Sequence, residues 1–288
     1  EPETCFEGMR KLDLAVHMAT KLNRSHLAVA KHTYLFPVIG RTERDTQLSG
    51  DQSVTVEDSM SMVHASRGSL EPASPHLKSE PALVAALAKA SLPNTVVPWD
   101  KLVSDYHFIR DAIESVFPAF KDFNKRIMNH GGFRLYNAAS ERKWNTPSGK
   151  ANFIVMHGIN EDPRSAQGHD LVLTTLRSHD QYNTTLYGMN DRYRGVTGRR
   201  DVLFINADEA ESRRLRVGDK VNVVALAPDG TPTARRMDNL TVVVHDMAPG
   251  SVATYYPEGN VLVPLNSYDD ESGIPAYKNV PIALEHCA

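Results

Sequence analysis

A run of apolar residues leads directly into a loop that is dense in hydrogen-bonding side chains. Residues 171–176, Leu-Val-Leu-Thr-Thr-Leu, have the composition of a buried strand. Loops that leave the ends of such strands are a common place for ligand contacts. The polar residues at this strand end and in the loop are Thr175, Arg177, Ser178, His179, Gln181, Asn183 and Thr184. Arginines and amides in this density favour a large, polar, anionic ligand, whereas the alternative is an ordinary hydrophilic surface loop.

Two later segments add polar residues of the same kinds. Asn260 stands in the string Gly-Asn-Val-Leu of residues 259–262, and Lys278 stands in Pro-Ala-Tyr-Lys-Asn of residues 275–279. A single Asn or Lys in a loop is usually a surface residue. The prediction therefore depends on the three segments together, and it requires Arg177, Asn260 and Lys278 to converge at one end of the fold.

These strings resemble the molybdopterin oxidoreductases of the DMSO reductase superfamily. Residues 175–184 resemble the start of the dinucleotide-binding domain of that superfamily, and the two later strings resemble its Asn-x-Leu and Pro-x-Tyr-Lys elements. The fuller string of residues 176–185, with Asn-Asp-Arg-Tyr-Arg-Gly at 190–195, is similar to the branch of formate-dehydrogenase-like alpha subunits. The resemblance runs through the whole chain and covers the carboxyl-terminal part of such an enzyme.

The resemblance implies a cofactor, a reaction and partners. The cofactor is a pair of pyranopterin guanine dinucleotides with molybdenum or tungsten, and the reaction is two-electron oxidation of formate to carbon dioxide. The implied cofactor contacts are Thr175, Arg177, Ser178, His179, Gln181, Asn183, Thr184, Asn260 and Lys278. The metal ligand and any iron–sulfur cluster are expected in upstream domains, so the resemblance assigns no catalytic or metal-binding residue to this chain. The expected partners are the upstream domains and an electron-transfer subunit.

Two other functions stay open. The first keeps the family and replaces formate by another small oxo-substrate that is reduced. The second is a non-enzymatic barrel module that binds a partner or a peptide, because a fold alone does not define a function. The cluster around Arg177 argues against that module, which has no need of it. His179 invites an acid or base role, which histidine often has in proteins, but a cofactor or domain contact is the preferred role.

Composition and charge set broader limits. The chain has 288 residues, 41% of them hydrophobic and 23% charged, which is typical of a globular protein. The formal net charge of −3 argues against nucleic-acid binding driven by overall charge. There is no apolar run of 18 residues and no signal-peptide pattern, so no membrane span and no export are expected. Cys5 and Cys287 lack the spacing of a metal site, and two free thiols fit a cytoplasmic location.

The first half of the chain is predicted to be α/β. Residues 12–18 alternate like a strand and residues 35–39 form a short apolar run, as in the end of a Rossmann-like, nucleotide-binding-type domain. Residues 40–75 are predicted to be a long irregular loop. Ser79 is expected to cap a helix with Leu83, Val84 and Leu87 on one face. Residues 100–117 keep a 3.6-residue apolar period up to Pro118, which predicts one continuous helix, and residues 120–127 predict another turn or two.

The second half is predicted to be a β-barrel. Short strands are expected at residues 202–205, 220–226, 240–244 and 251–255, and Pro-Asp-Gly at 228–230 is a hairpin signal. Asn206 is expected to cap a short helix with Glu209 as its capping partner. This strand spacing favours a closed barrel, and the family resemblance implies a six-stranded double-psi barrel. The predicted domains are residues 1–157, the end of an α/β domain with its linker, and residues 158–288, the dinucleotide-binding barrel.

Overall fold

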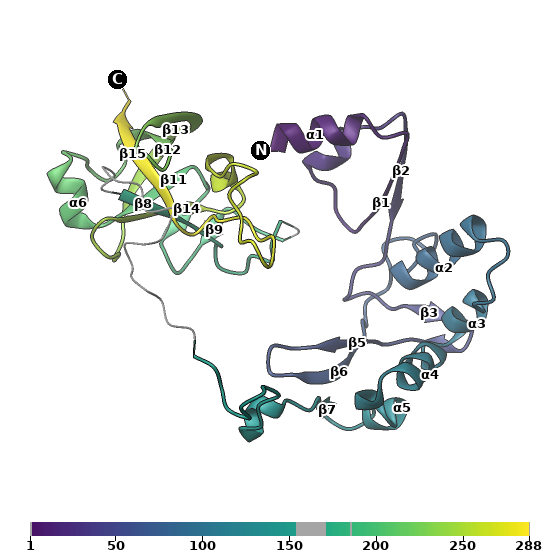
Figure 1. Ribbon diagram of the computed structural model, residues 1–288. Coiled ribbons are helices and arrows are strands. Elements are labelled where there is room, and N and C mark those ends of the chain that lie inside the picture. The colour runs from purple at the N-terminus through teal and green to yellow at the C-terminus, as the bar shows by residue number, and fades with distance from the viewer. Residues whose placement is uncertain (1, 154–170, 185, 288) are drawn as a thin grey trace. The chain divides into compact units, whose positions relative to one another are not determined.

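The computed structural model describes residues 2–153, 171–184 and 186–287 (Figure 1). The chain forms two compact units, one of Met9–Ile154 and the other of Glu1–Gly8 with Val155–Ala288. We call them the N-terminal unit and the barrel unit. The domain boundary predicted between residues 157 and 158 lies outside the described residues. Among those that are described, no helix is both long and apolar enough to cross a membrane.

The barrel unit is built around six strands that close on themselves. Their order around the barrel is β11-β13-β12-β15-β8-β14, and β14 also pairs with β11. The strands are β8 (Leu171–Leu176), β11 (Val202–Ile205), β12 (Lys220–Leu226), β13 (Pro232–Val244), β14 (Ser251–Tyr255) and β15 (Val280–His286). The short elements between them are β9 (Asn190–Asp191), β10 (Val196–Thr197), α6 (Ala207–Ser212) and η5 (Glu258–Leu262). The prediction of a closed, six-stranded barrel is confirmed.

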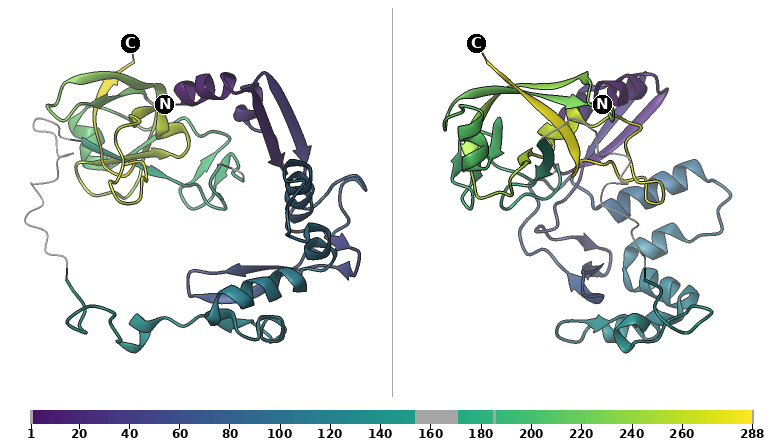
Figure 2. Two further views of the ribbon diagram at one scale, coloured as in Figure 1. Left: turned by 45° about the vertical axis from the view of Figure 1, so that its right-hand side comes forward. Right: turned by 60° about the vertical axis from the view of Figure 1, so that its left-hand side comes forward.

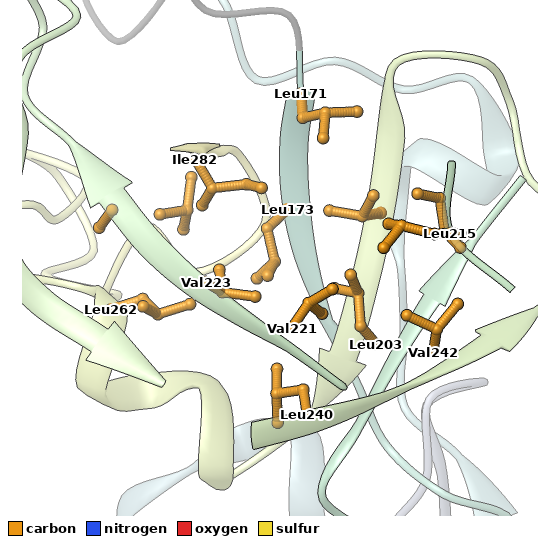
Figure 3. Close-up of a cluster of buried hydrophobic side chains, with 14 of the residues drawn as sticks. Leu171, Leu173, Leu203, Leu215, Val221, Val223, Leu240, Val242, Leu262 and Ile282 are labelled. Atoms are coloured by element: carbon orange, nitrogen blue, oxygen red, sulfur yellow. The ribbon is translucent and has the colours of Figure 1, made fainter. Parts of the chain in front are cut away.

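Branched apolar side chains fill the barrel, because β-branched residues suit a pleated surface and their burial removes apolar area from water. In β8 the buried residues alternate, with Leu171, Leu173 and Thr175 inside. Figure 3 shows these leucines approaching side chains from the other strands, among them Leu203, Val221, Val242 and Ile282. Barrel interiors of this size are filled by side chains, so any ligand site must lie at the rim.

The strand pairings decide which residues meet at that rim. β8 runs parallel to β14, with Leu176 opposite Tyr255, so the chain leaves both strands at the same end. β15 runs antiparallel to β8, with Val280 opposite Leu173, so the residues just before β15 lie at that same end. The loop after β8, the turn after β14 and the segment before β15 are therefore brought together by the barrel topology.

Local signals explain several elements of the barrel unit. Asn206 accepts a hydrogen bond from the Asp208 amide and caps α6, as predicted. Glu209 is not its reciprocal partner; its carboxylate accepts from the Gly250 amide at 3.1 Å and pairs with Arg213 at 3.0 Å. The Pro228–Gly230 hairpin is confirmed, since β12 and β13 pair antiparallel on either side of it.

The N-terminal unit combines short strands and helices (Figure 2). Its strands are β1 (Leu14–Ala19), β2 (His32–Pro37), β3 (Thr46–Gln47), β4 (Gly50–Asp51), β5 (Val54–Glu57), β6 (Met62–Ser66) and β7 (Phe133–Arg134). Its helices are α2 (Glu80–Ser91), α3 (Trp99–Ser104), α4 (His107–Val116) and α5 (Phe123–Arg126), with single turns η1 (Arg24–Leu27), η2 (Pro118–Phe120) and η3 (Ala138–Glu141). A further helix, α1 (Pro2–Arg10), precedes β1, and its residues up to Gly8 are counted with the barrel unit. Phe123, Ile127, Val63 and Phe133 form a buried cluster against which Ile113 of α4 packs.

Several predictions for the N-terminal unit are confirmed and others are wrong. Ser79 caps α2 as predicted, but Val84 is 48% exposed while Leu83 and Ala85 are buried. Residues 40–75 are not an irregular loop, because they contain the antiparallel pair β5–β6. β1 and β2 pair in parallel, as an α/β domain requires, but they form a sheet of two strands among the described residues, so a Rossmann-like fold is not established.

The predicted continuous helix over residues 100–117 is also wrong. α3 ends at Ser104 and α4 begins at His107, with Asp105 extended between them. Tyr106 is the cause, because its amide donates to Gln52 at 2.9 Å and its buried hydroxyl bonds with Asp45 and Ser79. These long-range hydrogen bonds replace the helical ones at this position.

Candidate cofactor site

Three chain segments meet at the carboxyl end of β8, and Thr175 lies at their centre. The Thr175 side chain is fully buried and donates a hydrogen bond to the Tyr277 carbonyl at 3.1 Å. Lys278, the next residue, donates through Nζ to the Thr175 carbonyl. From the other side, Gly259 lies so close that a Cβ atom added there would be 2.9 Å from Thr175 Cγ2. The structure thus brings the three predicted segments together.

Two cations lie near each other at this rim. Arg177 is exposed and donates to the Asn183 side chain, and Lys278 is exposed as well. Loss of hydration, and then the positive charge of Arg177, lower the pKa of Lys278. Without a ligand the two positive charges repel each other, so binding of an anion between them would be favourable.

Asn260 has an unused hydrogen-bonding group. It lies in η5, and its Oδ1 atom is buried with no hydrogen-bond partner in the described structure. A buried acceptor without a partner costs about 1–3 kcal/mol, so a ligand or water that donates to this atom would be favourable. Gly259 beside it holds the turn against Thr254 and Thr175, because a Cβ atom would be 2.8 Å from Thr254 Cγ2.

The loop after β8 is held in shape by its own side chains. The Gln181 side chain accepts from the Ser178 amide at 2.8 Å and donates to the Tyr256 carbonyl at 2.7 Å. Asp180 and Asn183 adopt left-handed backbone conformations, with φ of 61° and 45°, which Asp and Asn tolerate better than most residues. Ser178 and Gln181 therefore hold the loop in shape and connect it to the turn after β14.

The remaining predicted residues lie further along this loop. His179 Nε2 is 2.7 Å from Arg192 and 3.2 Å from Asp180, and its ring packs edge-on against Tyr193. Thr184 is exposed. Asp191, in contrast, is buried and accepts from the Tyr255 hydroxyl at 2.9 Å and from Arg194 at 2.7 Å. The basic cluster at 190–195 is thus partly an internal brace of the loop.

Arg200 is the residue that the sequence reasoning missed. It is only 5% exposed and pairs with Glu258 at 2.7 Å. It also donates to Ser178 Oγ at 2.8 Å and to the Tyr256 carbonyl at 2.7 Å. Its neighbours Arg199 and Asp201 pair with each other, and the sequence around Arg200 has no signal that marks it as the buried arginine of the three-residue segment.

The donor set at the rim fits a pterin dinucleotide. Arg177 and Lys278 supply positive charge for a pyrophosphate, and Asn260 supplies an unpaired amide oxygen for a heterocycle that carries N–H donors. In the part of the chain that the structure describes, no group of three or more His, Cys, Asp or Glu side chains could hold a metal ion.

Comparison with known proteins defines the class of the barrel. Residues 171–281 match the family model described as the molydopterin dinucleotide binding domain. The match supports a molybdopterin dinucleotide-binding domain in the barrel, with a molybdopterin-type cofactor as its ligand.

Two known proteins are similar to this chain over nearly its whole length. The chain is 58% identical over 277 residues to the protein YdeP of Escherichia coli (strain K12), covering 96% of this chain and 36% of that protein. It is 44% identical over 287 residues to the uncharacterized oxidoreductase Rv2900c of Mycobacterium tuberculosis, with 98% and 36% covered. The chain thus spans about a third of the length of these relatives.

A solved structure has a similar fold. Acetylene hydratase from Pelobacter acetylenicus superposes with a TM-score of 0.56 at 16% sequence identity, over 99% of this chain and 42% of that one. At this identity the likeness concerns the fold alone. The names of these three proteins leave the formate dehydrogenase branch, which was expected from the sequence, unconfirmed.

Proposed function

We propose that the rim at the end of β8 grips a pyranopterin guanine dinucleotide in a molybdenum or tungsten oxidoreductase that oxidises formate to carbon dioxide. One observation carries the proposal: three segments far apart in sequence converge on Thr175, next to the buried and unpaired Oδ1 atom of Asn260. The barrel topology accounts for the meeting of the segments. The unpaired Asn260 oxygen at the same rim as the cations Arg177 and Lys278 is the feature that supports a bound ligand.

The proposal gives each rim residue a role in binding. Asn260 pairs with the edge of the pterin, while Arg177 and Lys278 neutralise the pyrophosphate. Thr175, Ser178, Gln181 and Asn183 fix the backbone of the rim, and His179 and Thr184 contact the cofactor or a neighbouring domain. When bound, the metal–pterin group supplies the two-electron chemistry. The residues of this chain bind and orient it, and we assign none of them a catalytic role.

The proposal includes the finer points of the family resemblance. These are a double-psi connection of the barrel, a Rossmann-like domain to which β1 and β2 contribute, and domains of residues 1–157 and 158–288. They also include a second pterin dinucleotide, an iron–sulfur cluster held by an upstream domain, an electron-transfer subunit and a cytoplasmic location.

Two alternatives remain testable. One is a different small substrate on the same cofactor, because the solved neighbour is named a hydratase and one fold supports several reactions. The other is a barrel module without enzymatic function. The matched cofactor domain and the cationic rim at Arg177 and Lys278 favour the cofactor-binding function.

The decisive experiment measures cofactor content in the complete polypeptide. The protein is purified, its bound pterin is released and quantified by fluorescence, and molybdenum and tungsten are measured by mass spectrometry. Asn260→Ala is the test variant and Asn266→Ala, at an exposed loop position, is the matched control. We expect the control to keep its pterin and the test variant to lose it about tenfold faster, because a buried pterin N–H left without its acceptor costs about 1–3 kcal/mol.

The outcomes separate the parts of the proposal. Wild-type protein without pterin would overturn cofactor binding. Equal pterin retention in both variants would overturn the role of Asn260. Pterin-loaded protein that fails to reduce an artificial acceptor with formate, but turns over another small substrate, would overturn formate alone.

A further inference from the structure

A buried arginine ties together the segments that form the candidate site. Arg200 lies just before β11 and is 5% exposed. Its Nε and Nη2 atoms donate to the two carboxylate oxygens of Glu258 at 2.7 and 3.2 Å. This paired geometry is one that a guanidinium forms and an ammonium does not.

The same guanidinium reaches the loop after β8. Nη1 donates to Ser178 Oγ at 2.8 Å and to the Gly188 carbonyl at 3.4 Å. Nη2 donates to Gln181 Oε1 at 3.1 Å and to the Tyr256 carbonyl at 2.7 Å. Arg200 therefore bonds simultaneously to the loop that carries Arg177 and to the turn that leads into Asn260.

Two aromatic rings enclose the guanidinium. Its central carbon lies 4.6 Å from the ring centres of both Tyr187 and Tyr255. The two rings lie against the guanidinium, and its N–H groups all have acceptors within the protein. Arg200 therefore has no donor left for a ligand. Its effect on a ligand must act through the segments that it holds.

We propose that Arg200 is the positioning residue of the site: it locks residues 177–184 and 256–262 in their binding arrangement before the cofactor arrives. This inference rests on the proposed function of the barrel. Residues held in advance lose less freedom when a ligand binds, so the complex is tighter without a new contact. Glu258 is the counter-charge that keeps the buried guanidinium in place, since an unpaired buried charge is strongly unfavourable.

An ordinary structural role makes a different prediction. A residue that only stabilises the barrel would, when altered, loosen all strands together. Substitution of a positioning residue would instead loosen the two rim segments and leave the interior strands, such as β12 and β13, unchanged. Hydrogen exchange resolved by peptide distinguishes the two, because it reports local opening.

The experiment uses the complete polypeptide with Arg200→Lys, which keeps the charge but loses the planar fork. Arg199→Lys is the matched control, because Arg199 is the neighbouring residue and pairs with the exposed Asp201. Hydrogen exchange is measured without cofactor, and the release rate of bound pterin is followed by its fluorescence. We expect faster exchange confined to residues 177–184 and 256–262, and release about tenfold faster than in wild type, which corresponds to about 1.4 kcal/mol.

Each outcome decides the inference. Rim-confined exchange with faster release in Arg200→Lys, and wild-type behaviour in Arg199→Lys, supports it. Faster exchange across all barrel strands, or release within twofold of wild type, overturns it. If wild type carries no pterin, the proposed function fails, and the exchange pattern alone decides whether Arg200 positions the rim. Glu258→Gln should reproduce the rim-confined exchange, and unchanged exchange in that variant also overturns the inference.

Discussion

The substitution Gly259→Ala tests the close packing of the candidate site most directly. The added Cβ atom would lie 2.8 Å from Thr254 Cγ2 and 2.9 Å from Thr175 Cγ2, and both threonines are fully buried. These methyl groups are attached directly to Cβ and cannot rotate out of the contact, so either η5 or the strands β8 and β14 must shift. Overpacking of this kind destabilises by about 1–3 kcal/mol. We expect that loss in the barrel unit, together with weaker pterin binding through displacement of Asn260.

The clash can be relieved by a second substitution. Thr175→Ser removes the Cγ2 methyl and keeps the hydroxyl that donates to Tyr277. Alone, it should destabilise by about 1 kcal/mol, the value of a buried methyl group. Combined with Gly259→Ala it should relieve the clash with Thr175 but not the one with Thr254. The double variant should therefore be about 1 kcal/mol more stable than the sum of the two single losses predicts. Thr254→Ser provides the same test from the other strand.

The assay must report on the barrel unit. Both tryptophans, Trp99 and Trp144, belong to the N-terminal unit, so tryptophan fluorescence would follow the wrong part of the chain. Hydrogen exchange of the β8 and β14 amides in increasing urea gives the free energy of opening of these strands. A Gly259→Ala protein within 0.5 kcal/mol of wild type, with no coupling to Thr175→Ser, would refute the packing argument.

Two further predictions concern the rim charges and the N-terminal unit. Because Arg177 lowers the pKa of Lys278, Arg177→Gln should raise that pKa toward its ordinary value, measurable by NMR titration of the lysine Cε, whereas Arg236→Gln on β13 should not; an unchanged pKa in Arg177→Gln would contradict the proximity of the two cations. The pKa of Lys278 is lower in the folded protein than its ordinary value of 10.5. The charged lysine therefore lowers the stability of the fold at a pH below its folded pKa, and stability rises as the pH increases from that value to 10.5. Tyr106→Phe removes the hydroxyl that bonds Asp45 and Ser79 and should lower the stability of the N-terminal unit by about 1–3 kcal/mol in urea unfolding followed by tryptophan fluorescence. Tyr34→Phe, at a position 55% exposed, is its control and should stay within 0.5 kcal/mol, and equal stabilities for the two variants would show that the Tyr106 network contributes nothing.

Elements with a local signal were predictable from the sequence. Ser79 predicts the start of α2 because an N-cap serine accepts a hydrogen bond from a backbone amide two or three residues ahead. Pro228–Gly230 marks a hairpin for a similarly local reason, and the apolar run at 171–176 marks β8. The β5–β6 pair could also have been found, since Val-Thr-Val-Glu at 54–57 alternates as a strand does.

Other features depend on partners far away in sequence. The apolar period of residues 100–117 continues through Asp105, and α3 ends where Tyr106 bonds to Gln52, 54 residues earlier, and to Asp45 and Ser79. Arg200 looks like any arginine in a loop until Glu258 and Ser178 are placed beside it. The convergence of Arg177, Asn260 and Lys278 was predicted through the family resemblance, and their roles in binding stay predictions.

The order of the barrel strands also has a consequence for synthesis of the protein. β8 is translated first but lies between β14 and β15, and Val280 pairs with Leu173, about a hundred residues earlier in the chain. At 5–20 residues per second, β8 waits roughly 5–20 s on the ribosome for its second neighbour. Lys278 reaches Thr175 only at that moment. A cofactor that needs this rim must therefore be inserted after the barrel strands have been translated, which makes loading a step of maturation and leaves an apoprotein for the cell to protect until then.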